Sequence, residues 1–343
     1  MIMKKYLNKS LFYQGDAKII LPLALAYVGT FLITKIIIDE YFNWRLKGNL
    51  YNGYNNNLIY SFECVVILIL YLIISYIIIV GMFKRKKWST LLSGPFSRLD
   101  IRKRELILII ICAILYLIGY LIIIGQGAIK NAEIIRYIGD FKENIFMDVI
   151  RIISISTITI GGLALLDSIF ANTYYLIGSG IFIFIYFIAL ILNLESGLYS
   201  YINYENKGIR YVYNRIIEYL NGVHIGSSIS KLEIITISAF FVITGVILIF
   251  IAKRLTDNML VEHMNEGIIL NFPKKIAEFM LQTFIGIITA PYLSNLINDF
   301  YFRNSLFEKR LFLLRVIIII IISFISHILF KKFKSSKKEK YYL

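Results

Sequence analysis

Charged residues are scarce in this chain, and long stretches contain none at all. Only 17% of the 343 residues are Asp, Glu, Lys or Arg, whereas 58% are hydrophobic. A soluble domain typically has about 25% charged and roughly 45–50% apolar residues. Apolar runs of near-membrane length also recur too often for one soluble core to bury them all. The composition therefore excludes an ordinary soluble protein and indicates a polytopic membrane protein.

Residues that build covalent and metal sites are equally scarce. The two cysteines, Cys64 and Cys112, lie within apolar runs and match neither a disulfide framework nor a zinc site. The three histidines, His224, His263 and His327, lie in separate segments. No glycine-rich phosphate loop ending in Gly-Lys-Ser/Thr occurs in the sequence. We therefore expect no catalytic residue, cofactor site or metal site in this chain, and no enzymatic activity of its own.

Proline is rare too, with four residues in all, and no Pro- or Gly-rich linker divides the chain. We expect one all-α transmembrane bundle, because lipid offers free backbone groups no hydrogen-bond partner and so requires helix. Eight apolar runs are close to the ~20 residues that cross a bilayer as helix. The predicted spans are 19–38, 58–82, 106–124, 145–166, 175–194, 234–252, 281–297 and 311–330. The seventh is the weakest and contains Pro291.

The positive charge is distributed unevenly between the predicted loops. With the N-terminus inside, the inner segments carry 22 Lys and Arg residues and the outer segments carry 12. An excess of Lys and Arg marks the cytoplasmic side, so both termini are expected there. The net charge of +15 then reflects orientation and contact with membrane lipid, and we expect no nucleic-acid partner. High Ile, Asn, Lys and Tyr usage hints at an AT-rich bacterial genome and thus a bacterial cell membrane.

Several ionisable residues fall within or beside the predicted spans, where burial of charge is costly. Lys35 and Glu63 lie near the outer ends of the first two spans, which form a hairpin. They could pair within the membrane, or each could extend separately to the interface. For Arg151 and Arg315, near predicted outer ends, we expect extension to the interface. Asp167 is expected to be interfacial at the inner end of its span.

The most informative stretch is the basic segment 84–105 between spans two and three. An ordinary cytoplasmic loop against anionic lipid explains its lysines. It does not explain apolar residues at helical spacing followed by a Gly-Pro break; these apolar residues are Trp88, Leu91 and Leu92. A short amphipathic helix, a hinge and a second helix start would explain them, with Ser97 as the N-cap of the second helix. Such an element could dock on a partner as well as lie at the membrane.

Residues 91–101, with the sequence LLSGPFSRLDI, resemble a segment of ABC-2-type transporter permeases. That segment reads Leu-Leu-Ser-x-Pro, an aliphatic or aromatic residue, then Ser-Arg-x-x-Ile. In the family it follows the second span and forms the cytoplasmic coupling region that touches the ATPase subunit. The resemblance implies ATPase coupling by Trp88, Leu91, Leu92, Pro95, Phe96, Ser97 and Arg98.

The resemblance also implies a domain organisation. Residues 1–252 would form the six-span core, with coupling loop 84–105 and external segment 195–233. Residues 253–343 would add a cytoplasmic connection, a second transmembrane hairpin and a basic cytoplasmic tail. This last hairpin departs from the six spans usual in the family.

The function implied by the resemblance is that of a permease subunit of an ATP-driven exporter of a hydrophobic or peptide-like compound. ATP would bind to separate ATPase subunits, and a second permease chain, identical or different, would complete the transporter. Two hypotheses of other classes stay open. One is a non-catalytic membrane accessory or immunity protein, which would lack an ATPase partner. The other is a membrane-embedded enzyme, which would need polar residues that converge within the spans.

Overall fold

The computed structural model describes residues 17–42, 60–81, 97–135, 141–170, 173–200, 211, 214–216, 218–220, 230–257, 271–301 and 308–339. The named elements are all α-helices, as expected from the sequence. They are α2 (Ala17–Glu40), α4 (Phe62–Val80), α6 (Arg98–Lys130), α7 (Ala132–Ile135), α8 (Phe141–Ile169), α9 (Thr173–Ser200), α11 (Lys231–Asp257), α12 (Asn271–Tyr301) and α13 (Glu308–Glu339).

Seven of these helices are long and apolar enough to cross a bilayer. Their apolar ranges are Ile19–Glu40, Phe62–Val80, Arg98–Lys130, Phe141–Ile169, Lys231–Thr256, Lys274–Phe300 and Arg310–Lys332. The prediction of a multi-pass membrane protein is thereby supported. The count differs from the predicted eight, because the expected span 175–194 corresponds to a shorter apolar helix, Tyr174–Leu190.

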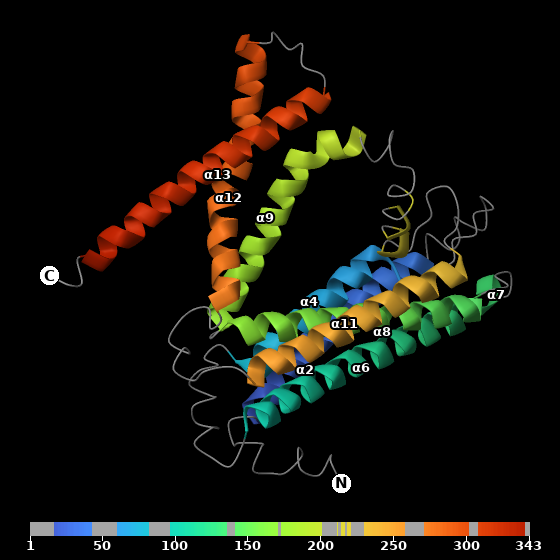
Figure 1. The fold of residues 1–343 in the computed structure, drawn as a ribbon. Coiled ribbons are helices and arrows are strands. Elements are labelled where there is room, and N and C mark those ends of the chain that lie inside the picture. Colours follow the sequence, from blue (N-terminus) through green and yellow to red (C-terminus); the bar gives the residue numbers. More distant parts are fainter. Residues whose placement is uncertain are drawn as a thin grey trace. The chain divides into compact units, whose positions relative to one another are not determined.

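The chain packs as two compact units. The first comprises Met1–Tyr174 with Asn214–Gly267, and the second comprises Tyr175–Tyr213 with Ile268–Leu343. Helices α2, α4, α6, α8 and α11 belong to the first unit, and α9, α12 and α13 to the second (Figure 1). The predicted domain boundary between residues 252 and 253 is implied by the family resemblance. The packing of helices within the chain does not test it, so it stays a prediction.

Contacts at both ends of α6 give its direction within the first unit. Near its start, Arg102 reaches Tyr76 close to the end of α4 and Asp167 close to the end of α8. Towards its other end, Tyr120 contacts Tyr60, which precedes α4, and Asp148 near the start of α8. Helix α6 therefore runs antiparallel to both α4 and α8.

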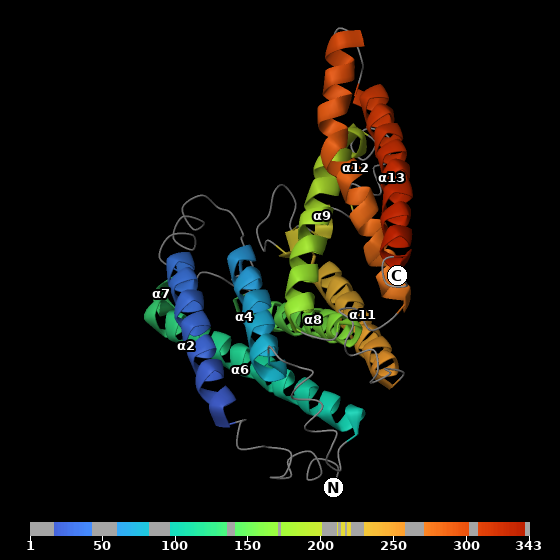
Figure 2. The same cartoon turned by 90° about the vertical axis from the view of Figure 1, so that its left-hand side faces the viewer.

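Helices α8 and α11, in contrast, run parallel to each other and lie side by side in both views (Figures 1 and 2). Near their starts, Lys231 forms an ion pair with Glu143. Farther along both helices, Gly245 approaches the backbone of Thr157 and Gly161. A Cβ atom built on Gly161 would lie 2.4 Å from the carbonyl oxygen of Gly245. Glycine on both helices thus permits the close backbone approach that small residues give transmembrane helices.

The second unit contains an antiparallel helix pair. Gln282 of α12 contacts His327 of α13, and Ser294, farther along α12, contacts Arg315, which lies earlier in α13. Helix α9 runs parallel to α12, since Tyr186 bonds Thr283 and Asn193 bonds the next turn of α12. Polar contacts therefore join all three helices although each is largely apolar.

Asn193 replaces a backbone hydrogen bond that Pro291 removes. Proline has no N–H, so the carbonyl of Ile287, four residues earlier in α12, has no intrahelical donor. The side-chain amide of Asn193 donates to this oxygen at 2.7 Å and also to the carbonyl of Ala189 at 2.8 Å. A free carbonyl is costly in lipid. The hydrogen bond from Asn193 removes this cost and so allows a proline at position 291 of the helix.

Substitution of Asn193 by Ala should lower the free energy of unfolding by about 1–3 kcal/mol, because it leaves a buried carbonyl without a donor. The cost should fall in a Pro291→Ala background, where residue 291 supplies its own N–H. Thermal unfolding of the four variants in detergent measures this coupling. Equal costs of Asn193→Ala in both backgrounds would contradict the assigned role.

Candidate functional site

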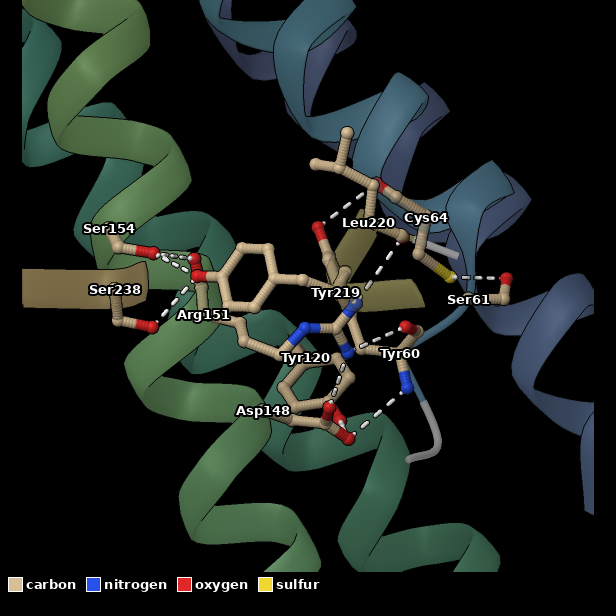
Figure 3. Close-up of polar contacts among 10 residues, drawn as sticks. All are labelled: Tyr60, Ser61, Cys64, Tyr120, Asp148, Arg151, Ser154, Tyr219, Leu220 and Ser238. Atoms are coloured by element: carbon tan, nitrogen blue, oxygen red, sulfur yellow. Dashed lines mark hydrogen bonds and ion pairs between the residues drawn. The ribbon is translucent and has the colours of Figure 1, made fainter. Parts of the chain in front are cut away.

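The most deeply buried charges of the first unit form an ion pair near the start of α8. Asp148 and Arg151 stand one turn apart, and both side chains are 0% exposed. Arg151 Nη1 donates to Asp148 Oδ1 at 3.0 Å. Figure 3 shows the guanidinium group of Arg151 surrounded by groups from other segments of the chain. We call this cluster the outer-end cluster, since the Lys/Arg distribution predicts that this end faces outwards.

Backbone carbonyls accept hydrogen bonds from both terminal nitrogens of Arg151 (Figure 3). Nη1 donates to the carbonyl of Tyr60 at 3.0 Å, and Nη2 donates to the carbonyls of Tyr219 and Leu220. The guanidinium carbon also lies 5.9 Å from the ring centroid of Tyr60 and 5.4 Å from that of Tyr219. Cation–π contacts of this kind add attraction in a desolvated site.

The carboxylate of Asp148 is satisfied in the same way. Its Oδ2 accepts from the backbone N–H of Tyr60 at 3.1 Å and from the hydroxyl of Tyr120 at 3.0 Å. Asp148 thus links α8 to α6 and to the entry of α4. Further hydrogen bonds allow a buried ion pair to persist, and here they reach both oxygens of Asp148 and both terminal nitrogens of Arg151, whereas the buried Nε of Arg151 has no partner among the described residues.

Tyr219 connects the segment before α11 to α8. Its hydroxyl lies 2.6 Å from the hydroxyl of Ser154 on α8 and 2.8 Å from that of Ser238 on α11. Burial raises the pKa of Tyr219, so its side chain stays neutral and can donate. Part of the predicted external segment 195–233 therefore packs into the bundle and covers Arg151.

The prediction for Arg151 was wrong, because its side chain turns into the bundle and does not extend to the interface. Two features keep the side chain inside the bundle, one in the local sequence and one in the tertiary structure. Asp148 lies three residues earlier on the same helix face, which is a signal readable from the sequence. The carbonyls that complete the site come from Tyr60, Tyr219 and Leu220, and their approach depends on packing between distant segments.

A second buried cluster lies at the opposite ends of the same helices, and we call it the inner-end cluster. Arg102 forms ion pairs with Asp167 and, at 3.4 Å, with Glu105. It also donates to the hydroxyl of Tyr76 at 2.8 Å and to the carbonyl of Ala164. The prediction that Asp167 is simply interfacial was wrong, since its side chain is 1% exposed and opposes Arg102.

The predicted coupling residues fall largely outside the described residues. Those outside are Trp88, Leu91, Leu92, Pro95 and Phe96. The other two, Ser97 and Arg98, lie at the start of α6. The prediction that Ser97 caps a helix is confirmed: its hydroxyl accepts from the backbone of Asp100, whose carboxylate accepts from the backbone of Ser97. The helix then continues without a break, so residues 98–105 of the expected loop are helical.

The structure places Lys35 half-buried on α2 and Glu63 exposed in the first turn of α4. No ion pair between them occurs in the part of the chain that the structure describes. Their pairing in the membrane stays a prediction. Arg315 is half-buried on α13 and bonds Ser294, so it too turns towards the bundle.

Neither cluster has the composition of a metal site. Among the described residues, no group of three or more His, Cys, Asp and Glu side chains is placed to hold a metal ion. What the two clusters can do is tie α4, α6 and α8 together at both ends. Comparison of the chain with protein-family models, with curated proteins and with solved structures gives no match.

Proposed function

We propose that this protein is the membrane-embedded permease subunit of an ATP-driven transporter, coupled to separate ATPase subunits through the segment 84–105. The observation that supports it most directly is the buried ion pair between Arg102 and Asp167. Arg102 follows the coupling-like sequence 91–101 immediately, on the same helix. Force applied to that segment would therefore reach α8 through a desolvated contact.

Helix α6 is suited to transmit such a displacement. It runs uninterrupted from Arg98 to Lys130, a length of about 50 Å at 1.5 Å per residue. Its first turns hold the inner-end cluster, and Tyr120 reaches the outer-end cluster. Closure of ATPase subunits on ATP would bias the bundle between two arrangements by differential binding to one of them. We propose export of a hydrophobic or peptide-like compound as the transport activity.

The directions of the helices support the eight-span topology as part of this proposal. Helices α8 and α11 run parallel, as their contacts near residues 143, 157 and 161 indicate. If both cross the bilayer, the chain between them must cross it once more in the opposite direction. Within the described residues of that interval, Tyr174–Leu190 is the apolar helix available for this crossing. With this span included, both termini lie on the Lys-rich, cytoplasmic side.

The test is purification of the tagged protein from its native membrane with mild detergent. We expect an ATPase with a phosphate-binding loop to co-purify in stoichiometric amount. Phe96→Asp should reduce its recovery about tenfold or more, since it would place a charge in the proposed contact with the ATPase. Lys142→Asp, an exposed change at the other end of the bundle, is the matched control and should leave recovery unchanged.

Two outcomes would contradict the proposal. Full recovery of the ATPase with the Phe96→Asp variant would remove the assigned role of segment 84–105. Recovery of well-folded protein without any ATPase would favour the hypothesis of a non-catalytic accessory or immunity protein instead.

A further inference from the structure

A small cavity lies between α2 and α6, beside the outer-end cluster. Its walls include Tyr27, Phe31 and Thr34 of α2 and Tyr116, Gly119 and Tyr120 of α6. Most of these side chains carry a hydroxyl group, so polar atoms border the space as well as apolar ones. The cavity is therefore a place where a polar ligand could meet partners from two helices.

The size of the cavity limits what it can hold. Its volume is about 10 Å³, counted as the room for the centre of a water-sized sphere. Room of this size holds about one water molecule. A lipid headgroup or an amphipathic transport substrate is far larger, so neither fits. Water occupies buried space when polar groups there can bond it, and the hydroxyls of the walls decide whether they can.

The hydroxyl of Tyr116 has hydrogen-bonding capacity left. It lies 3.3 Å from the hydroxyl of Thr34 and 3.4 Å from both the hydroxyl of Tyr60 and the carbonyl of Cys64. Hydrogen bonds between oxygen atoms normally measure about 2.5–3.0 Å, so all three contacts are weak. Tyr116 is only 4% exposed. A buried hydroxyl without a strong partner is costly, which favours an additional ligand on the cavity side.

The hydroxyl of Tyr27 borders the same space from the opposite wall. It lies 2.8 Å from the position that a Cβ atom on Gly119 would take, so glycine at this place makes room for it. Among the described residues, this hydroxyl forms no hydrogen bond. Lipid offers it no acceptor either. Two hydroxyls on facing helices thus have capacity for one shared partner.

We propose that this cavity binds one water molecule, which joins the hydroxyl groups of Tyr27 and Tyr116 across the interface of α2 and α6. A hydroxyl can donate one hydrogen bond and accept two, so the water can accept from Tyr27 and donate to Tyr116. Tyr120 borders the same site and donates to Asp148 at 3.0 Å. The water thereby attaches α2 to the polar network of the outer-end cluster. This inference does not depend on the proposed transport function.

Radiolytic footprinting of the purified full-length protein in detergent tests this inference. X-ray pulses convert water into hydroxyl radicals, which oxidise the side chains in contact with it, and mass spectrometry gives the oxidation rate of each residue. We expect Tyr116 to be oxidised severalfold faster than Tyr76. Both tyrosines are buried, at 4% and 1% exposed, but Tyr76 lies in the inner-end cluster, away from the cavity.

Tyr27→Phe removes one of the two proposed partners of the water and keeps the ring. It should lower the oxidation rate of Tyr116 towards that of Tyr76. Tyr175→Phe is the matched control, because Tyr175 is an exposed tyrosine outside the cavity. It should leave the rate unchanged. Equal rates for Tyr116 and Tyr76 in the wild-type protein would overturn the proposal, as would a fast rate at Tyr116 that survives Tyr27→Phe.

A pulse of isotopically labelled water just before irradiation separates a bound molecule from bulk solvent. A bound molecule exchanges slowly, so the oxygen added to Tyr116 should at first be unlabelled. Exposed tyrosines such as Tyr175 should take up the label at once. Uptake of the label by Tyr116 as fast as by Tyr175 would show that solvent reaches Tyr116 freely, and the assignment of a bound water would then be wrong.

Discussion

Replacement of Asp148 by Ala is expected to destabilise the protein by about 3–5 kcal/mol, the cost of leaving one member of a buried ion pair without its partner. Arg151 is fully buried, so water cannot replace the lost carboxylate. The change also removes the acceptor for the backbone N–H of Tyr60 and for the hydroxyl of Tyr120. Thermal or denaturant unfolding in detergent should show this loss as a large decrease in midpoint.

Glu143→Ala is the matched control for this prediction. Glu143 lies on the same helix and pairs with Lys231, but both side chains are about half-exposed. Exposed ion pairs contribute only about 0–1 kcal/mol, so this variant should unfold almost as the wild type does. Replacing Asp148 and Arg151 together by Leu should not recover the loss, because the N–H of Tyr60 and the carbonyls that accept from Arg151 then stay buried without partners. Similar midpoints for Asp148→Ala and Glu143→Ala would refute the burial of the pair.

Two adjacent glycines on α8 should respond to the same substitution in opposite directions. Gly161→Ala places a methyl group 2.4 Å from the carbonyl oxygen of Gly245, so the two backbones must move apart. Overpacking of this kind costs about 1–3 kcal/mol. Gly162→Ala meets nothing within 4 Å. It should be neutral or stabilise the helix by up to about 1 kcal/mol, since Ala is the better helix former.

The measurement is the unfolding midpoint of both variants under identical conditions. Their difference cancels the shared gain in helix propensity and isolates the contact between α8 and α11. If Gly161→Ala proved as stable as Gly162→Ala, the two helices would not approach each other as closely as the structure indicates. A larger side chain in place of Gly245, such as Leu, should be more harmful still.

Hydropathy alone located the helices of this protein well. Seven of the eight predicted spans correspond to long apolar helices, because a run of about twenty apolar residues has few alternatives to a membrane helix. The capping of α6 by Ser97 was also readable from the sequence, since Ser97 and Asp100 stand at the spacing of a capping box. These features depend on residues that are neighbours along the chain.

The burial and the partners of the charged side chains in the spans could not be predicted from the sequence in the same way. For Arg151 and Asp167, distance from the end of an apolar run predicted an interfacial position, and both side chains are buried with partners. The partners of Arg151 include carbonyls of residues 60, 219 and 220, far away in the sequence. No local pattern specifies which carbonyl will approach an arginine, because that depends on helix rotation and register.

The sequence by itself therefore determined that this is a multi-pass helical membrane protein with a positively charged predicted cytoplasmic side. The length of an apolar run, the charge of a loop and the capping of a helix are properties of single segments. None of them depends on how the helices pack against one another. Only the tertiary structure decided that α8 and α11 run parallel, that Asn193 replaces the hydrogen bond lost at Pro291, and that Arg151 is paired. Each of these depends on contacts between distant segments, whose geometry is fixed when the helices pack.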